Sequence, residues 1–176
     1  MKIIVLAGGL STERDVSLTS SAGICKTLIE KGHDAFLLDV FMGLPDAPEN
    51  LKDVFTLPNH GLEIAKNIST TEPDLAAVKA SRPDQSDCFL GPNVIELCRL
   101  ADITFLGLHG GEGENGKLQA TFDLLGIRYT GPDSLGCALA MDKGVTKVIF
   151  QRCNVSTPGG GWLYKKDRDK PLSEMG

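Results

Sequence analysis

Two polar loops carry the side chains of this sequence that could do chemistry. The first, residues 8–15 (GGLSTERD), contains the carboxylate of Glu13, and the second, residues 109–116 (HGGEGENG), contains the imidazole of His109 and four glycines. A carboxylate and an imidazole that converge on one crevice can bind the charged groups of a small zwitterion, or position groups around a developing charge. Glycines at this density let a backbone approach a ligand closely or take positive φ angles. The two loops are therefore candidates for one binding site.

Each loop follows a predicted strand and precedes a predicted helix. Residues 2–7 (KIIVLA) are almost continuously apolar, as expected for a central strand buried on both faces of a parallel sheet, and residues 103–108 (ITFLGL) form a second apolar run of this kind. Apolar residues at helical spacing over 18–29, with a stop at Gly32, predict the first helix, and residues 33–40 (HDAFLLDV) supply a further strand. Ligands of open α/β sheets bind outside the carboxyl ends of the strands, so both loops should line the same crevice.

The remaining segments complete the predicted element order. Residues 41–92 hold six of the nine prolines and no sustained period, which predicts a long irregular excursion in which residues 61–67 could form a turn of helix. The first helix could be capped by Ser11, Thr12 or Asp15, and near Asn154 the composition shifts towards a hinge. The sequence further predicts helices at 93–100, 118–125 and 135–141, a helix that Asp142 caps and that runs to Cys153, short strands at 127–130 and 162–164, and a charged turn at 165–170.

This order of elements predicts an α/β fold. We expect an open, mostly parallel, Rossmann-like sheet with helices on both faces, followed near Asn154 by the start of a second domain that is not completed. The glycines after the first strand do not form G-x-G-x-x-G, and neither G-x-x-x-x-G-K-[ST] nor G-x-S-x-G is present. Dinucleotide binding, P-loop hydrolysis and an α/β-hydrolase triad therefore lose their main support.

Composition narrows the function classes further. A formal net charge of −5 and a pI near 5.2 argue against a nucleic-acid binder. No apolar run approaches the roughly 20 residues that span a bilayer, and the amino terminus is unlike a signal peptide, so a cytoplasmic protein is expected. Five scattered cysteines without a Cys-x-x-Cys pair suit a reducing compartment and indicate neither disulfides nor zinc.

Each candidate side chain also has an ordinary structural explanation. Glu13 could be a first-turn acid that faces the positive end of a helix dipole. His109 could merely end a strand, since histidine is often only partly buried. Lys143, beside a predicted helix start, could be a solvated surface lysine. Taken singly, these residues do not decide between structure and function.

Three segments together closely resemble, in order, the amino-terminal half of the D-alanine:D-alanine ligases of the ATP-grasp superfamily. They are residues 8–20 (GGLSTERDVSLTS), 108–131 (LHGGEGENGKLQATFDLLGIRYTG) and 138–147 (ALAMDKGVTK). The corresponding family patterns are G-G-x-S-x-E-R-x-V-S-L, H-G-x-x-G-E-D-G-x-x-Q and M-D-K-x-x-[TS]-K. The matches frame nearly the whole chain and leave residues 41–90 as a variable region.

The resemblance implies a pre-ATP-grasp substrate domain at residues 1–140, and a linker helix with the incomplete start of the central ATP-grasp domain at 141–176. The activity it implies is ATP-dependent joining of two D-alanines through an acyl phosphate, for peptidoglycan precursor synthesis, in a homodimer formed through this domain. Mg²⁺ is implied as well, but the family holds it in its carboxyl-terminal half. We therefore expect no metal ligands in this chain and no activity from the chain alone.

The resemblance also implies roles for single residues. Glu13 falls on the glutamate that orients the ammonium of the first D-alanine, and His109 falls on the histidine near its carboxyl group and the acyl phosphate, which makes both catalytic. Ser17 and Gly110 fall in the same substrate-binding site. Lys143 falls on the lysine that contacts the phosphates of ATP.

Some alternatives stay open. Asn115 stands where the family usually has aspartate, which keeps an acceptor but loses a charge and puts an electrostatic role there in doubt. Within the family, a D-Ala-D-lactate or D-Ala-D-Ser ligase is the runner-up, because second-substrate choice lies mostly outside this half. From a different class, the chain could be a stand-alone ligand-binding or interface module without catalysis. A third alternative is a nucleotide-binding oxidoreductase, but the missing glycine fingerprint argues against it.

Overall fold

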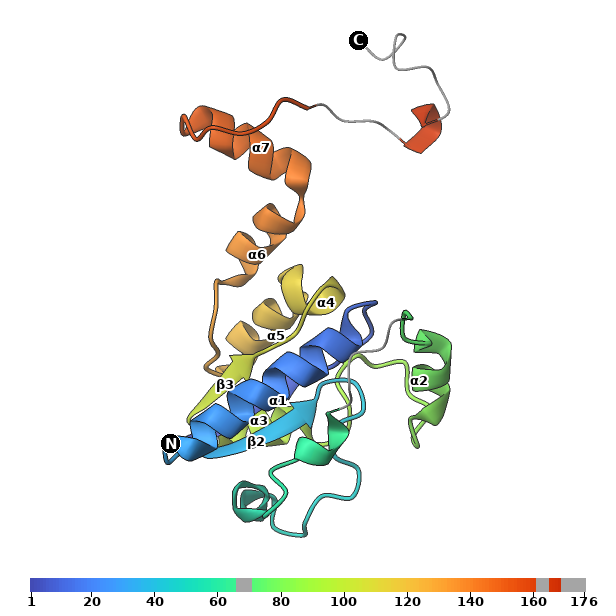
Figure 1. The fold of residues 1–176 in the computed structure, drawn as a ribbon, viewed down its shortest axis with the longest axis vertical. Helices are drawn as coiled ribbons and strands as arrows, with labels where there is room; N and C mark the ends of the chain where they lie inside the picture. The colour runs from blue at the N-terminus through green and yellow to red at the C-terminus, as the bar shows by residue number, and fades with distance from the viewer. Residues whose placement is uncertain (66–70, 161–164, 169–176) are drawn as a thin grey trace.

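The computed structural model describes residues 1–65, 71–160 and 165–168. In this part of the chain a parallel sheet is enclosed by helices, while α6 (Ser134–Met141) and α7 (Lys143–Arg152) stand away from the sheet (Figure 1). The predicted α/β fold is confirmed.

The sheet in the described residues has three strands, β1 (Lys2–Ala7), β2 (Asp34–Asp39) and β3 (Ile103–Leu106). Their order is β2-β1-β3, and both pairings are parallel. Lys2 pairs with Asp34 at the start of β1, and the register continues to the last residue of both strands. The first strand is central, as predicted, whereas β3 ends earlier than predicted.

Helices cover both faces of this sheet. Successive strand residues point to opposite faces, and α1 (Arg14–Glu30) packs on the face that carries Val5. Helices α3 (Val94–Leu100) and α5 (Lys117–Leu125) pack on the face that carries Leu6. Burial on both faces explains why the strand sequences are apolar throughout rather than alternating.

The excursion between β2 and α3 contains more structure than predicted. It forms the 3-10 helices η1 (Leu51–Thr56) and η2 (Leu62–Ile64) and the helix α2 (Leu75–Ser81). The prediction of an irregular segment over 41–92 is therefore wrong in part, and Val54 of η1 is fully buried in the core. These elements span one or two turns each, too few residues to show a helical period in the sequence.

Three local predictions are corrected by the structure. A one-turn helix, α4 (Gly111–Glu114), lies inside the second loop. The strand predicted at 127–130 is reduced to an isolated bridge between Thr104 and Tyr129, because the parallel pairing there does not continue. Glu13, rather than a serine, threonine or Asp15, occupies the N-cap position of α1, and its side chain makes no capping hydrogen bond.

The carboxyl-terminal helices begin where the sequence indicated. Asp142 caps α7 as predicted, because its carboxylate accepts hydrogen bonds from the backbone N–H groups of Gly144 and Val145 at 2.9 and 3.0 Å. The start of the predicted charged turn is the 3-10 helix η3 (Lys165–Asp167), and the strand predicted at 162–164 lies outside the described residues. A domain boundary at residue 140 stays a prediction.

Candidate functional site

The two polar loops are joined at their base by a buried serine. The Ser17 hydroxyl, on the first turn of α1, accepts a hydrogen bond from Gly8 N at 2.9 Å and donates one to Gly107 O at 2.7 Å. The Ser21 hydroxyl, one turn further along α1, donates to the same Gly107 carbonyl at 3.1 Å. The residues that follow β1 and β3 are thus held together through α1.

A second serine joins the loops nearer to the surface. The Ser11 hydroxyl donates to the backbone carbonyl of His109 at 2.6 Å and accepts from the Glu13 N–H at 3.2 Å. One side chain therefore fixes the backbone of both candidate residues, although they are far apart in the sequence.

The Glu13 and His109 side chains lie on these joined loops. Glu13 is exposed, and its Oε2 lies 2.9 Å from the place that a Cβ atom on Gly110 would occupy. The His109 side chain is 40% exposed, with Nδ1 4.0 Å from Glu114 Oε1 and Nε2 3.4 Å from Ser20 Oγ. The first contact becomes an ion pair only when the imidazole is protonated. The structure therefore brings the Glu13, His109 and Gly110 segments to one edge of the sheet.

Gly110 is the position where this edge requires glycine. Its φ of 67° and ψ of 176° form a conformation that is essentially restricted to glycine. The conformation turns the chain from the strand into α4 and leaves room for the Glu13 carboxylate.

Ser17 has a different environment from the other predicted substrate-binding residues. It is 0% exposed, and both hydrogen-bonding functions of its hydroxyl are directed to backbone groups. In this structure Ser17 supports the loops from beneath, and a direct contact with substrate stays a prediction.

Lys143 is not brought to the same edge. It is the first residue of α7, the helix that lies beyond α6 (Figure 1), and its side chain is exposed. Because the Asp142 carboxylate already occupies the N–H groups of Gly144 and Val145, the ammonium is what this helix start offers to a phosphate. An ammonium on a flexible stem binds phosphate as a point charge. The position of Lys143 is therefore compatible with the predicted contact to ATP, which stays a prediction.

Neither a metal-binding cluster nor a membrane-spanning helix is present in the described ranges of the chain. These residues contain no group of three or more His, Cys, Asp or Glu side chains that could hold a metal ion. None of their helices is long and apolar enough to cross a membrane.

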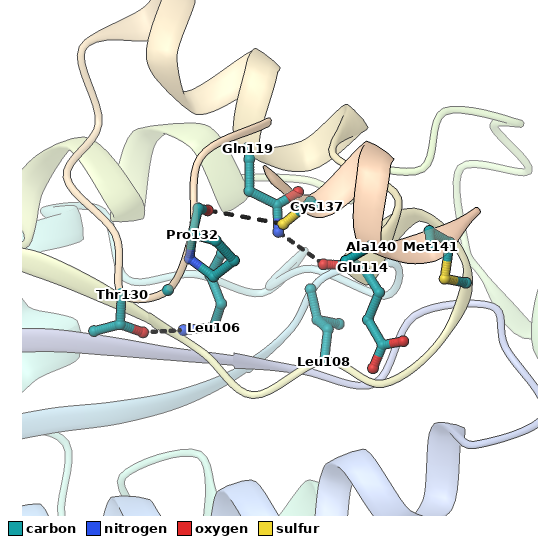
Figure 2. Close-up of a pocket in the computed structure, with 11 residues that line it drawn as sticks. Leu106, Leu108, Glu114, Gln119, Thr130, Pro132, Cys137, Ala140 and Met141 are labelled. Atoms are coloured by element: carbon teal, nitrogen blue, oxygen red, sulfur yellow. Dashed lines mark hydrogen bonds between the residues drawn. The ribbon is translucent and has the colours of Figure 1, made fainter. Parts of the chain in front are cut away.

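A cavity of about 320 Å³ opens between the second loop and α6 (Figure 2). Leu108 and Met141 contribute to its apolar wall, and Gln119 and Glu114 are among its polar groups. Gln119 donates from Nε2 to the Gly113 carbonyl at 2.8 Å and so braces the loop. The second loop is therefore exposed to ligand-sized space on the side of α6.

Sequence reasoning missed a buried ion pair beneath the first loop. Arg14 and Asp39 form a salt bridge, and they are 8% and 3% exposed. The Arg14 Nη1 group also donates to Gly9 O at 2.8 Å. The available signal was an aspartate directly after the apolar run of β2, because buried charges are almost always paired.

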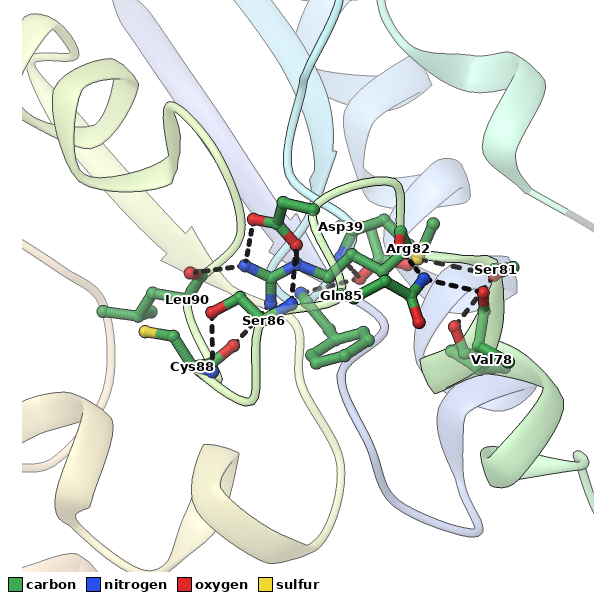
Figure 3. A network of polar contacts seen from close by, with 12 residues as sticks. Asp39, Val78, Ser81, Arg82, Gln85, Ser86, Cys88 and Leu90 are labelled. Carbon is green, nitrogen blue, oxygen red and sulfur yellow. Dashed lines mark hydrogen bonds and ion pairs between the residues drawn. The ribbon is translucent and has the colours of Figure 1, made fainter.

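A second buried arginine, Arg82, was also missed. Its side chain lies within the network of polar contacts in Figure 3. It is 2% exposed, and its guanidinium lies 4.8 Å from the Phe41 ring centroid. Nη1 donates to Cys88 O at 2.5 Å, and Nε lies 2.7 Å from Asp84 Oδ1 as an ion pair. The hydrogen bond from Arg82 holds the pKa of Asp84 below its ordinary value. Arg82 thus fastens the segment after α2 to the residues that follow β2.

Comparisons with known proteins agree with this geometry. A family model described as D-ala D-ala ligase N-terminus matches residues 2–132. The chain is 43% identical over 175 residues to the D-alanine–D-alanine ligase of Pediococcus pentosaceus. The aligned region covers 97% of this chain and 48% of that ligase. It is 42% identical over 161 residues to the ligase of Lacticaseibacillus casei, and this aligned region covers 90% of this chain and 44% of that ligase. The crystal structure of the Bacillus anthracis ligase complexed with ATP has a TM-score of 0.60 at 23% identity, over 99% of this chain and 42% of that one, and supports the fold alone.

The fold and the joined loops define an α/β domain with a candidate ligand site at the carboxyl edge of a parallel sheet. The chain belongs to the D-alanine–D-alanine ligase family, within which it matches the amino-terminal domain. It spans about half the length of the curated relatives that it matches.

Proposed function

We propose that this chain forms the amino-terminal substrate domain of an ATP-dependent D-alanine:D-alanine ligase that serves peptidoglycan precursor synthesis in the cytoplasm. The observation that carries the proposal is the Ser11 bridge, which fixes the backbones of Glu13 and His109 together at the ligand-binding edge of the sheet. The family match supports the same conclusion.

The proposed roles follow from the chemistry of each group. The Glu13 carboxylate pairs with the ammonium of the first D-alanine. This contact orients the carboxylate of that D-alanine for phosphorylation by ATP. His109 lies beside that carboxyl group, where an N–H donor stabilises negative charge on the acyl phosphate. The amine of the second D-alanine then attacks the acyl carbon, the peptide bond forms and phosphate leaves.

The nucleotide end of the reaction uses residues outside this edge. Lys143 is proposed to contact the phosphates of ATP through its ammonium. Mg²⁺ would supply charge neutralisation on the phosphates, and its ligands are expected beyond the described residues. The proposed homodimer and the domain boundary at residue 140 rest on the family resemblance.

A chimera tests the proposal. This chain is fused to the remaining half of the Pediococcus pentosaceus ligase, to which it is 43% identical, and ADP release is measured with and without D-alanine. We expect release that depends on D-alanine from the chimera and none from the chain alone. A well-folded chimera without such release would contradict the proposed function.

A further inference from the structure

The Arg14 and Asp39 ion pair lies directly beneath the loop that carries Glu13. Asp39 ends β2, and Arg14 begins α1 immediately after Glu13. The two side chains are almost completely buried, at 10% and 4% exposure, so neither is placed to contact a ligand itself. Arg14 and Asp39 can therefore affect ligand binding only through the groups to which they are hydrogen-bonded.

Those groups are backbone atoms of both neighbouring loops. Arg14 donates to the carbonyl of Gly9 at 2.8 Å. Asp39 Oδ1 accepts from Phe41 N at 2.9 Å, from Met42 N at 3.2 Å and, at a longer 3.4 Å, from Gly9 N. The pair therefore binds the turn after β1 to the turn after β2.

The fit around Gly8 leaves little room for another arrangement. A Cβ atom at Gly8 would lie 2.7 Å from Asp39 Cγ, and Gly8 has a φ of 74°. The carboxylate thus packs against the backbone of the loop, and movement of Asp39 would move Gly8 and Gly9 with it.

Stability alone does not account for buried charges at this place. The cost of removing two charges from water largely offsets their attraction, and well-packed apolar residues often replace such a pair without loss of stability. An ion pair differs from an apolar contact because its donors and acceptors have fixed directions. Its distinctive effect here is to fix the course of the loop that presents Glu13.

We propose that Arg14 and Asp39 are positioning residues that set the Glu13 carboxylate for the ammonium of the first D-alanine. This inference rests on the proposed function. Glu13 makes no side-chain cap bond to α1, so its position depends on the backbone that precedes Arg14. A catalytic or binding group that is displaced by about 1 Å can slow an enzyme by about 100-fold, even though the group itself is still present.

Kinetics of the active chimera test the inference. Asp39→Asn keeps one acceptor oxygen and removes the charge, and Arg14→Lys keeps the charge and removes the forked geometry. We expect each variant to raise the KM for D-alanine by about 10- to 100-fold with no change in the KM for ATP. A purely structural role would reduce the folded fraction, and hence the apparent kcat, without separating the two KM values.

Asp34→Asn is the matched control, because Asp34 is exposed at the opposite end of β2 and should leave both KM values unchanged. If Asp39→Asn does not fold, Arg14→Lys decides by the same criterion. An unchanged KM for D-alanine in the folded variants, or an equal rise in both KM values, would overturn the positioning role alone. An unmodified chimera that lacks D-alanine-dependent ADP release would overturn the proposed function, and the positioning role with it.

Discussion

The Ser17 hydroxyl donates a hydrogen bond to the carbonyl of Gly107 across 2.7 Å, at the point where β3 gives way to the second loop. The same oxygen accepts from Gly8 N at the equivalent point after β1. A single buried hydroxyl thus forms hydrogen bonds with backbone groups from two strand ends.

Replacing Ser17 tests this bridge. Ser17→Ala leaves the buried Gly8 N–H without its partner, whereas Gly107 O keeps the hydrogen bond from Ser21. One unsatisfied buried group costs about 1–3 kcal/mol, so the free energy of unfolding from urea titrations should fall by that amount. The exposed Ser20→Ala is the control, with a change within about 0.5 kcal/mol. Equal effects of the two variants would show that the bridge contributes nothing.

Gly110→Ala should harm both stability and substrate binding. Its backbone conformation costs another residue about 1–3 kcal/mol, and the new Cβ would lie 2.9 Å from Glu13 Oε2. Gly126→Ala is the control, since Gly126 also has a positive φ but a Cβ there meets nothing within 4 Å. Both variants should melt at lower temperature, and only Gly110→Ala should raise the KM of the chimera for D-alanine. A normal KM in Gly110→Ala would contradict the placement of Glu13.

Glu13→Gln separates a substrate contact from a helix-dipole effect. A hydrogen bond to a charged group contributes about 1.5–3 kcal/mol, so the KM for D-alanine should rise by about 10- to 100-fold. Asp15→Asn removes an acid from the first turn of α1, just after the N-cap residue Glu13, and should alter only stability. If the two variants behave alike in kinetics and in melts, Glu13 acts on the helix dipole alone.

Lys143→Ala should affect ATP use and not folding. The exposed side chain lies at the positive end of the α7 dipole, where a cation is mildly unfavourable. The free energy of unfolding should therefore change by less than about 0.5 kcal/mol, while the KM of the chimera for ATP rises. The exposed Lys26→Ala on α1 should change neither quantity. A large loss of stability with normal ATP kinetics would make Lys143 structural.

Asp84 should make folding sensitive to acid. The hydrogen bond from Arg82, followed by that from Ser86 N, lowers the pKa of Asp84 in the folded chain. Its stabilising contribution is therefore present above the ordinary pKa of aspartate and is lost as the pH falls through the lowered value. Urea midpoints at about pH 7 and about pH 3, on either side of the ordinary value, should show Asp84→Asn destabilised mainly at the higher pH. A difference that is independent of pH would contradict this role for the carboxylate.

Sequence patterns predicted the elements whose signal is local. The strands β1 and β2 each have a continuous apolar run, and the helices α1, α5 and α7 each have a helical period with a glycine stop or an aspartate cap. The same signals placed Glu13 and His109 on loops after strands, which the structure then joins through Ser11.

The missed features depend on contacts between distant residues. No local pattern pairs Arg14 with Asp39, or places Arg82 against Phe41, because these partners meet only once the sheet and the excursion are folded. The helix α4 was missed for a different reason. Glycine has a low helix propensity, and tertiary contacts, including the Gln119 hydrogen bond to Gly113, favour the helical turn there.

The central position of β1 also has a consequence for synthesis of the chain on the ribosome. Once β2 has paired with β1, the other edge of β1 has unpaired backbone N–H and C=O groups until residues 103–106 are made. Such an edge of an apolar strand is a template for pairing with another chain. At roughly 5–20 residues per second, this interval lasts several seconds. Pairing of β3 with β1 covers this edge and places Gly107 within hydrogen-bonding distance of Ser17.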